Sequence, residues 1–181
     1  VAIGYNAMSG AIVAELVNDC VAIGSGALSG ALDSTNGIDE ASGTVAIGKS
    51  ALAALTVGAQ NTAIGFEALK TSVDGDNNTA VGYEALETYE GSDGDGANTA
   101  IGSQAMQAAS TGQINTAVGA GALKALLTTN SNVAVGKDAL TALTVGAQNV
   151  AIGTFALDAA AVNESNNIAI GSGSMGACDQ G

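Results

Sequence analysis

The stretch Asn-Thr-Ala-Ile-Gly-Phe-Glu-Ala-Leu at residues 61–69 contains the pattern that decides the fold. Its Ala-aliphatic-Gly triplet occurs ten times in the 181-residue chain, and successive copies lie between 17 and 24 residues apart. A short period held over a whole chain is typical of a solenoid, in which each repeat forms one coil and buries its apolar side against its neighbours. We therefore predict a single repeat domain over residues 1–181, built of about ten stacked coils of about 17 residues each.

Each triplet is expected to be a short strand, which predicts an all-β, parallel β-solenoid (a β-roll). The residue before the triplet alanine is Val, Thr or Ile in every copy, and β-branched residues favour strands. Side chains alternate between the two faces of a strand, so Thr62 and Ile64 share one face while Ala63 and Gly65 share the other. We expect Thr62 and Ile64 to face the interior, leaving Ala63 and Gly65 as a bare outer face for another chain.

Two local features allow more than one interpretation. The segments 51–55 and 122–127 are rich in Ala and Leu and could each form a single helical turn, although an all-β coil is favoured. Asn precedes the strand in seven copies, beginning with Asn61. It could form a ladder of side-chain amides from coil to coil or serve as a turn residue, and we favour the turn residue.

Composition excludes several classes of function. Seventeen acidic residues against four basic ones give a net charge of −13, which would repel nucleic acid and anionic lipid. No apolar run approaches the ~20 residues that cross a bilayer, so no membrane insertion is expected. The chain contains no His, the usual general base near neutral pH and a common zinc ligand. We therefore expect neither an enzyme nor a bound cofactor.

Two copies carry insertions, at 29–43 and 87–97, and insertions in solenoids emerge as loops that often bind partners. The second loop supplies the candidate recognition residues Tyr89, Asp93 and Asp95. The acidic pairs within 74–77 and 93–96 have the spacing of calcium loops but lack the downstream Glu of an EF-hand. We interpret both as solvated turns and predict no metal site.

Cys20 and Cys178 lie in the second and the last coil. In one rigid stack they would be far beyond the ~7 Å between Cα atoms that a disulfide tolerates. Exposed strand edges at uncapped ends would permit end-to-end addition of subunits, and the two cysteines are then candidates for an inter-subunit disulfide. Two buried thiols are the favoured alternative.

The sequences NTAIG at 61–65 and at 98–102 resemble the repeats shared by YadA-like heads of trimeric autotransporter adhesins and by tail-fibre proteins of bacteriophages. This resemblance extends over the whole chain. It implies a left-handed β-roll that forms a homotrimer, with rows of small residues meeting between chains. The 17-residue period is longer than is usual for the head repeats and is closer to the fibre type.

A block at residues 48–61 recurs at 136–149 with 12 of 14 residues identical, as expected when a spacer grows by whole coils. We therefore expect a structural or adhesive fibre segment, the shaft or head of a phage tail fibre or virion appendage, which presents a surface to a receptor or glycan. The alternative is a bacterial extracellular adhesin or a self-assembling filament subunit. Either function places the chain outside a cell or on a virion.

Overall fold

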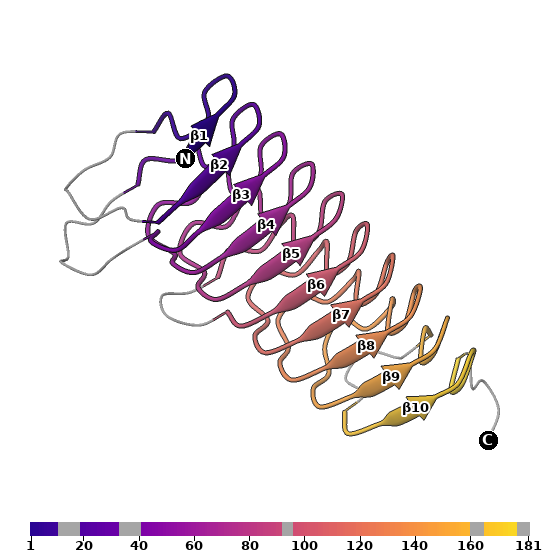
Figure 1. The fold of residues 1–181 in the computed structure, drawn as a ribbon. Helices are drawn as coiled ribbons and strands as arrows, with labels where there is room; N and C mark the ends of the chain where they lie inside the picture. The colour runs from indigo at the N-terminus through magenta and orange to yellow at the C-terminus, as the bar shows by residue number, and fades with distance from the viewer. Residues whose placement is uncertain (11–18, 33–40, 92–95, 160–164, 177–181) are drawn as a thin grey trace.

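The computed structural model describes residues 1–10, 19–32, 41–91, 96–159 and 165–176. The chain forms a parallel β-solenoid of about eight turns whose strands lie in one sheet (Figure 1). Each copy of the triplet forms one strand, which confirms the predicted solenoid class. The ten strands are β1 Ala2–Ile3, β2 Val21–Ile23, β3 Val45–Ile47, β4 Thr62–Ile64, β5 Thr79–Val81, β6 Thr99–Ile101, β7 Thr116–Val118, β8 Val133–Val135, β9 Val150–Ile152 and β10 Ile168–Ile170.

The strands follow one another in chain order, and every neighbouring pair is parallel. Equivalent positions pair throughout, so Ala63 of β4 lies beside Ala46 of β3 and Ala80 of β5. Backbone bonds continue this register beyond the strands, because the Thr62 N–H donates to the Asn78 carbonyl at 2.8 Å and the Gly65 N–H to the Ile47 carbonyl at 2.8 Å. The coils are therefore stacked without lateral shift, and equivalent side chains form rows along the solenoid.

The predicted orientation of the strands is wrong. Ala63 is fully buried, as is its equivalent in each of β2 to β9, whereas Ile64 is 37% exposed and Thr62 is half-buried. The alanines therefore face the interior, where the buried Ala68 and Leu69 of the opposite wall pack. A coil this narrow has room for a methyl group from the sheet but not for a larger aliphatic side chain, because interiors are close-packed.

The glycine that follows each of β2 to β9 is half-buried, and a side chain there would meet the backbone of the next coil. Gly136 has φ of +134°, and a Cβ atom there would lie 2.5 Å from the carbonyl oxygen of Gly153 in the next coil. The triplet therefore ends in Gly because backbone approaches backbone at this point.

The segments that could have been helical turns are instead non-helical turns, and the described residues contain no helix. Within 51–55 the Leu52 N–H donates to the Ala68 carbonyl of the next coil at 3.0 Å. Residues in this wall alternate in hand, with φ of +57° at Ser50 and +49° at Leu52. Left-handed residues in alternation aim the backbone groups at neighbouring coils, which prevents the intra-segment bonds of a helix. Within the described ranges, no helix has the length and apolarity needed to cross a bilayer.

Candidate functional site: the outward strand face

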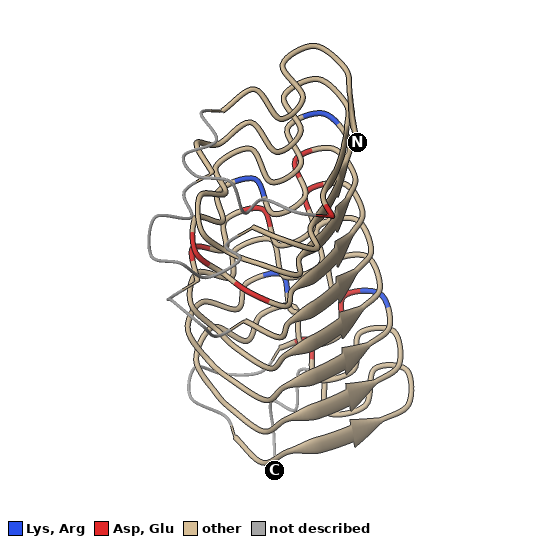
Figure 2. Cartoon of the chain, turned by 60° about the vertical axis from the view of Figure 1, so that its left-hand side comes forward, with Lys and Arg blue, Asp and Glu red and all other residues tan. Residues whose placement is uncertain are grey.

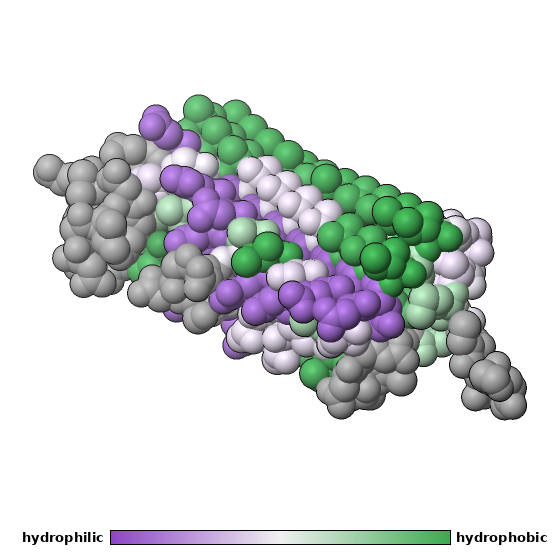
Figure 3. Space-filling model, turned by 90° about the horizontal axis from the view of Figure 1, so that it is seen from below, coloured by the Kyte–Doolittle hydropathy of each residue, from purple (hydrophilic) through white to green (hydrophobic). Residues whose placement is uncertain are grey.

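The strands present an outward face made of two continuous rows of side chains. Three of its isoleucines, Ile64, Ile101 and Ile152, are 37–40% exposed. The first row consists of Val21, Val45, Thr62, Thr79, Thr99, Thr116, Val133, Val150 and Ile168, and the second of Ile23, Ile47, Ile64, Val81, Ile101, Val118, Val135, Ile152 and Ile170. We call these two rows the outward face. A hydrophobic band runs along the length of the molecule in Figure 3.

No residue of the outward face carries a charge, although the chain as a whole is strongly acidic. Figure 2 shows the acidic and basic residues of the described chain in the turns, while the strands are free of them. Isolated exposed aliphatic residues are ordinary on a protein surface, but large contiguous apolar patches mark interaction surfaces. This face is therefore the strongest candidate for a functional surface.

Aromatic residues directly follow the strand glycines at Phe66 and Tyr83, which we call the aromatic row, while Phe155 lies one position later in its own coil. The rings of Phe66 and Tyr83 stack with centroids 5.4 Å apart and planes 8° from parallel. Lys49 belongs to the coil before that of Phe66, and its ammonium lies 5.5 Å from the Phe66 ring centroid. The Lys137 ammonium lies 4.8 Å from the ring centroid of Phe155. Such cation–π contacts contribute about 0.5–1 kcal/mol at exposed sites. The row therefore extends the apolar surface beyond the strands, and its rings are held by stacking.

A network of carboxylates and amides lies beside this aromatic row. Glu67, Glu84 and Glu87 have carboxylate oxygens within 4.8 Å of one another, the one group of possible metal ligands found in the described chain. The cluster already has donors of its own, because the Lys70 ammonium lies 2.9 Å from Glu67 and the Gln107 amide donates to Glu84 at 2.7 Å. These carboxylates therefore have a structural explanation without a cation.

Three pKa values in this network are shifted. The hydrogen bond that Tyr83 donates to Glu84, with partial burial and nearby carboxylates, raises the pKa of Tyr83. The same bond, with another from Gln104, lowers the pKa of Glu84. The hydrogen bond that Lys70 donates to Glu67 raises the pKa of Lys70. Nearby positive charge and hydrogen-bond donors thus favour the ionised form of these carboxylates. This is expected for a network that holds neighbouring turns together.

The sequence-predicted recognition residues do not assemble into a described site. Tyr89 is fully buried in the core, so it is not available to a partner from solvent. Asp93 and Asp95 lie outside the described residues, as does most of the 29–43 loop. In the other acidic turn, Asp76 Oδ1 accepts a hydrogen bond of 2.6 Å from the Ala59 N–H, which links adjacent coils.

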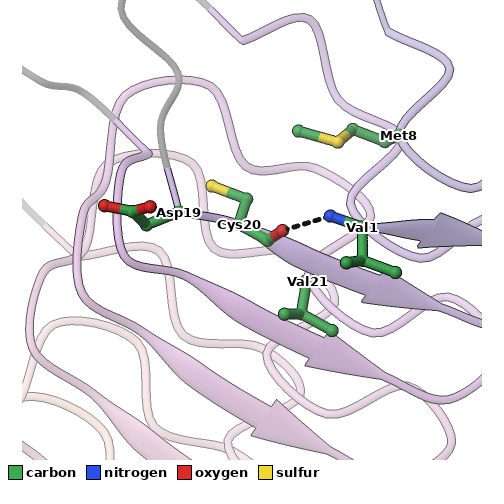
Figure 4. Close-up of a pocket in the computed structure, with 5 residues that line it drawn as sticks. All are labelled: Val1, Met8, Asp19, Cys20 and Val21. Carbon is green, nitrogen blue, oxygen red and sulfur yellow. Dashed lines mark hydrogen bonds between the residues drawn. The ribbon is translucent and has the colours of Figure 1, made fainter.

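Cys20 lies in a shallow hollow lined also by Val1, Met8, Asp19 and Val21 (Figure 4). The Cys20 thiol donates to the Ala41 carbonyl at 2.9 Å, and the Val1 amino group donates to the Cys20 carbonyl at 2.7 Å. Burial raises the pKa of this thiol, which makes it less reactive. Cys178 lies outside the described residues, so the inter-subunit disulfide stays a prediction.

The asparagine row forms a ladder, and the turn-residue interpretation is wrong. Asn61, Asn78, Asn98, Asn115, Asn132 and Asn149 are fully buried, and each side-chain oxygen accepts from the next Asn along the stack. The left-handed residue is the one before the asparagine, such as Gln60 with φ of +57°. The signal was available in the sequence, because a polar residue repeated at one phase of a solenoid stacks on its own copies.

Comparison with protein-family models, with curated proteins and with solved structures finds no match to this chain.

Proposed function

We propose that this chain is a structural segment of an extracellular or virion-borne fibre, the shaft or head of a tail fibre or appendage, whose copies pack together through the outward face. The observation that carries the proposal is a strand face with no charged side chain along the whole length of an otherwise acidic solenoid. The motif's resemblance to YadA-like heads and phage fibre repeats favours a left-handed homotrimer of ten-coil chains. Copies are proposed to meet through the Val/Thr and Ile rows and not through the Ala and Gly rows, because the strand alanines are buried and the strand glycines are half-buried against the next coil.

The size of the face supports association between copies. Nine strands, β2 to β10, spaced ~4.8 Å apart make a strip about 43 Å long, and three strand residues make it about 10 Å wide, or roughly 430 Å². This area lies within the ~300–600 Å² of the largest apolar patches of monomeric proteins, which are often functional, and is about half of the ~800 Å² per partner of a specific interface. The aromatic row of Phe66 and Tyr83 supplies further apolar area, and so does Phe155 farther along the solenoid.

A rigid, repetitive rod suits a spacer. Each coil contacts mainly its neighbours, so whole coils can be added without altering any other contact. The near-identical blocks at 48–61 and 136–149 fit such growth. A bacterial surface adhesin or filament subunit is the alternative, and electron microscopy separates the two, because a filament subunit would give end-to-end assemblies where a fibre segment gives short rods.

The test is the oligomeric state of the purified chain and of a face variant. We expect wild type to be trimeric by light scattering and native mass spectrometry, and Ile101→Lys/Val118→Glu to be monomeric, because a buried charge would be desolvated. Ala142→Lys introduces a charge at an exposed turn residue and is expected to leave the trimer intact. A wild-type chain that stays monomeric at its highest soluble concentration would overturn the proposal.

A further inference from the structure

The first row of the outward face contains a polar block. Thr62, Thr79, Thr99 and Thr116 occupy equivalent positions in four consecutive strands, β4 to β7. Valine occupies the same position in the coils on either side, where Val45 pairs with Thr62 and Val133 pairs with Thr116. The row is therefore aliphatic at both ends and carries four hydroxyl groups in its middle.

The hydroxyl groups of this block are not used within the described chain. None of the four side chains hydrogen bonds to a described protein atom, and all four are half-buried at the surface of the sheet. Thr and Val have nearly the same shape, so packing and strand preference do not explain the exchange. The difference between the two residues on this face is one hydrogen-bonding group per coil.

Burial against another copy would give these hydroxyls a specific requirement. A hydroxyl that loses water and meets an aliphatic side chain is left without a partner, which is unfavourable. A hydroxyl that meets another hydroxyl can donate to it and accept from it. The same four groups therefore favour one axial alignment, in which block meets block, and disfavour every alignment shifted by whole coils.

We propose that the four-threonine block fixes the axial register of neighbouring copies in the assembly, so that each chain packs against an unshifted second copy of itself. The inference rests on the proposed function, because it requires copies to meet at the outward face. Without the block, the nearly uniform rows would permit slippage by one coil at the loss of only one rung of contact. With the block present, a shift of one chain by one coil places one threonine hydroxyl of each chain opposite a valine, and each further coil of shift adds one more. A polar residue in an apolar interface selects register in the same way in coiled coils.

The experiment moves the block by one coil without changing composition. Thr62→Val/Val133→Thr shifts the four threonines to β5 to β8, and Val45→Thr/Thr116→Val shifts them to β3 to β6. Each variant is refolded with isotope-labelled wild type, and native mass spectrometry measures the mixed oligomers. The matched control is Ile47→Val/Val81→Ile, which also exchanges two side chains of the face but leaves the block in place.

We expect the control to mix with wild type in binomial proportions, each shifted variant to mix several-fold less, and the two shifted variants to mix with each other least. Each shifted variant alone is expected to form the wild-type oligomer. Binomial mixing of both shifted variants with wild type overturns the register proposal while the proposed function stands. A monomeric wild type overturns both. If one shifted variant fails to fold, the other, mixed with wild type, decides the question.

Discussion

The side-chain oxygen of Asn98 accepts two hydrogen bonds from Asn115 in the next coil, one from its backbone N–H at 3.0 Å and one from its Nδ2 at 3.2 Å. The Asn115 amide also donates to the Thr129 carbonyl at 2.8 Å, so one side chain links the strand to the opposite end of its own coil. Repeated along the stack, this geometry satisfies a column of buried polar groups that water does not reach.

We expect Asn115→Leu to destabilise the fold by about 2–5 kcal/mol. The substitution leaves the backbone N–H of Asn132 without its acceptor inside the core, while Asn132 Nδ2 keeps the Gly146 carbonyl. It also removes the two hydrogen bonds that Asn115 Nδ2 donates, to Asn98 Oδ1 and to the Thr129 carbonyl. Urea unfolding followed by circular dichroism measures the change. The control is Asn130→Ala, whose exposed side chain accepts one bond from the Gln113 N–H and is expected to cost about 1 kcal/mol or less. Equal effects of the two substitutions would contradict the ladder's role.

Enlarging an inward-facing strand alanine should destabilise the fold much more than enlarging its outward-facing neighbour. Ala117 is fully buried between the equivalent alanines of β6 and β8, so Ala117→Leu would overpack the coil and destabilise it by about 1–3 kcal/mol or more. Val118→Leu, one residue later on the outward face, is expected to change stability of the isolated chain by less than about 0.5 kcal/mol. Thermal unfolding of both variants measures the two losses of stability. If Val118 and not Ala117 faced the interior, Val118→Leu would be the more destabilising substitution.

The repeat alone was sufficient to predict one strand per triplet, because period and strand alternation are properties of the sequence. Alternation states which residues share a face, however, and not which face is inside. The missing quantity was the width of the coil, which depends on how the opposite wall packs. Side-chain size was the available signal, since Ala63 and its equivalents are Ala in every copy, whereas Ile64 exchanges with Val.

The candidate site was harder to predict for the same reason. Tyr89 was predicted as a recognition residue of the 87–97 loop, yet its ring is buried against Gly75, where an added Cβ would lie 2.6 Å from Tyr89 Cε1. The first residues of this insertion still pack in the core, and composition does not indicate such a contact. Likewise, the threonine block could be identified as part of a contact surface only once the structure showed that Thr62 faces outward.

The strand glycines should be intolerant of any side chain. Gly136→Ala combines a φ of +134° with a Cβ placed 2.5 Å from the Gly153 carbonyl oxygen, and we expect it to prevent stable folding or cost about 3 kcal/mol or more. Gly173→Ala is the control, because its φ is +65° and no heavy atom lies within 4 Å of the added Cβ. Its cost should be about 1 kcal/mol, from backbone conformation alone. A Gly136→Ala protein with the unfolding midpoint of Gly173→Ala would show that the stacked glycines do not limit the fold.

The phenol of Tyr83 should titrate at higher pH than an ordinary tyrosine, because it donates to the ionised Glu84 carboxylate. A pKa raised on folding stabilises the protein below the ordinary value of 10.0, and this contribution is lost as pH rises through the folded pKa. The lowered pKa of Glu84 acts in the opposite direction, so its contribution is present above the ordinary value of 4.5 and is lost as pH falls through the folded pKa. We expect Glu84→Gln to return the Tyr83 pKa toward 10.0. Phenolate absorbance, with Tyr83→Phe subtracted to isolate this ring, measures the shift, and Asp138→Asn, which alters a carboxylate outside this network, should leave it unchanged. An unaltered Tyr83 titration in Glu84→Gln would rule out the hydrogen bond as its cause.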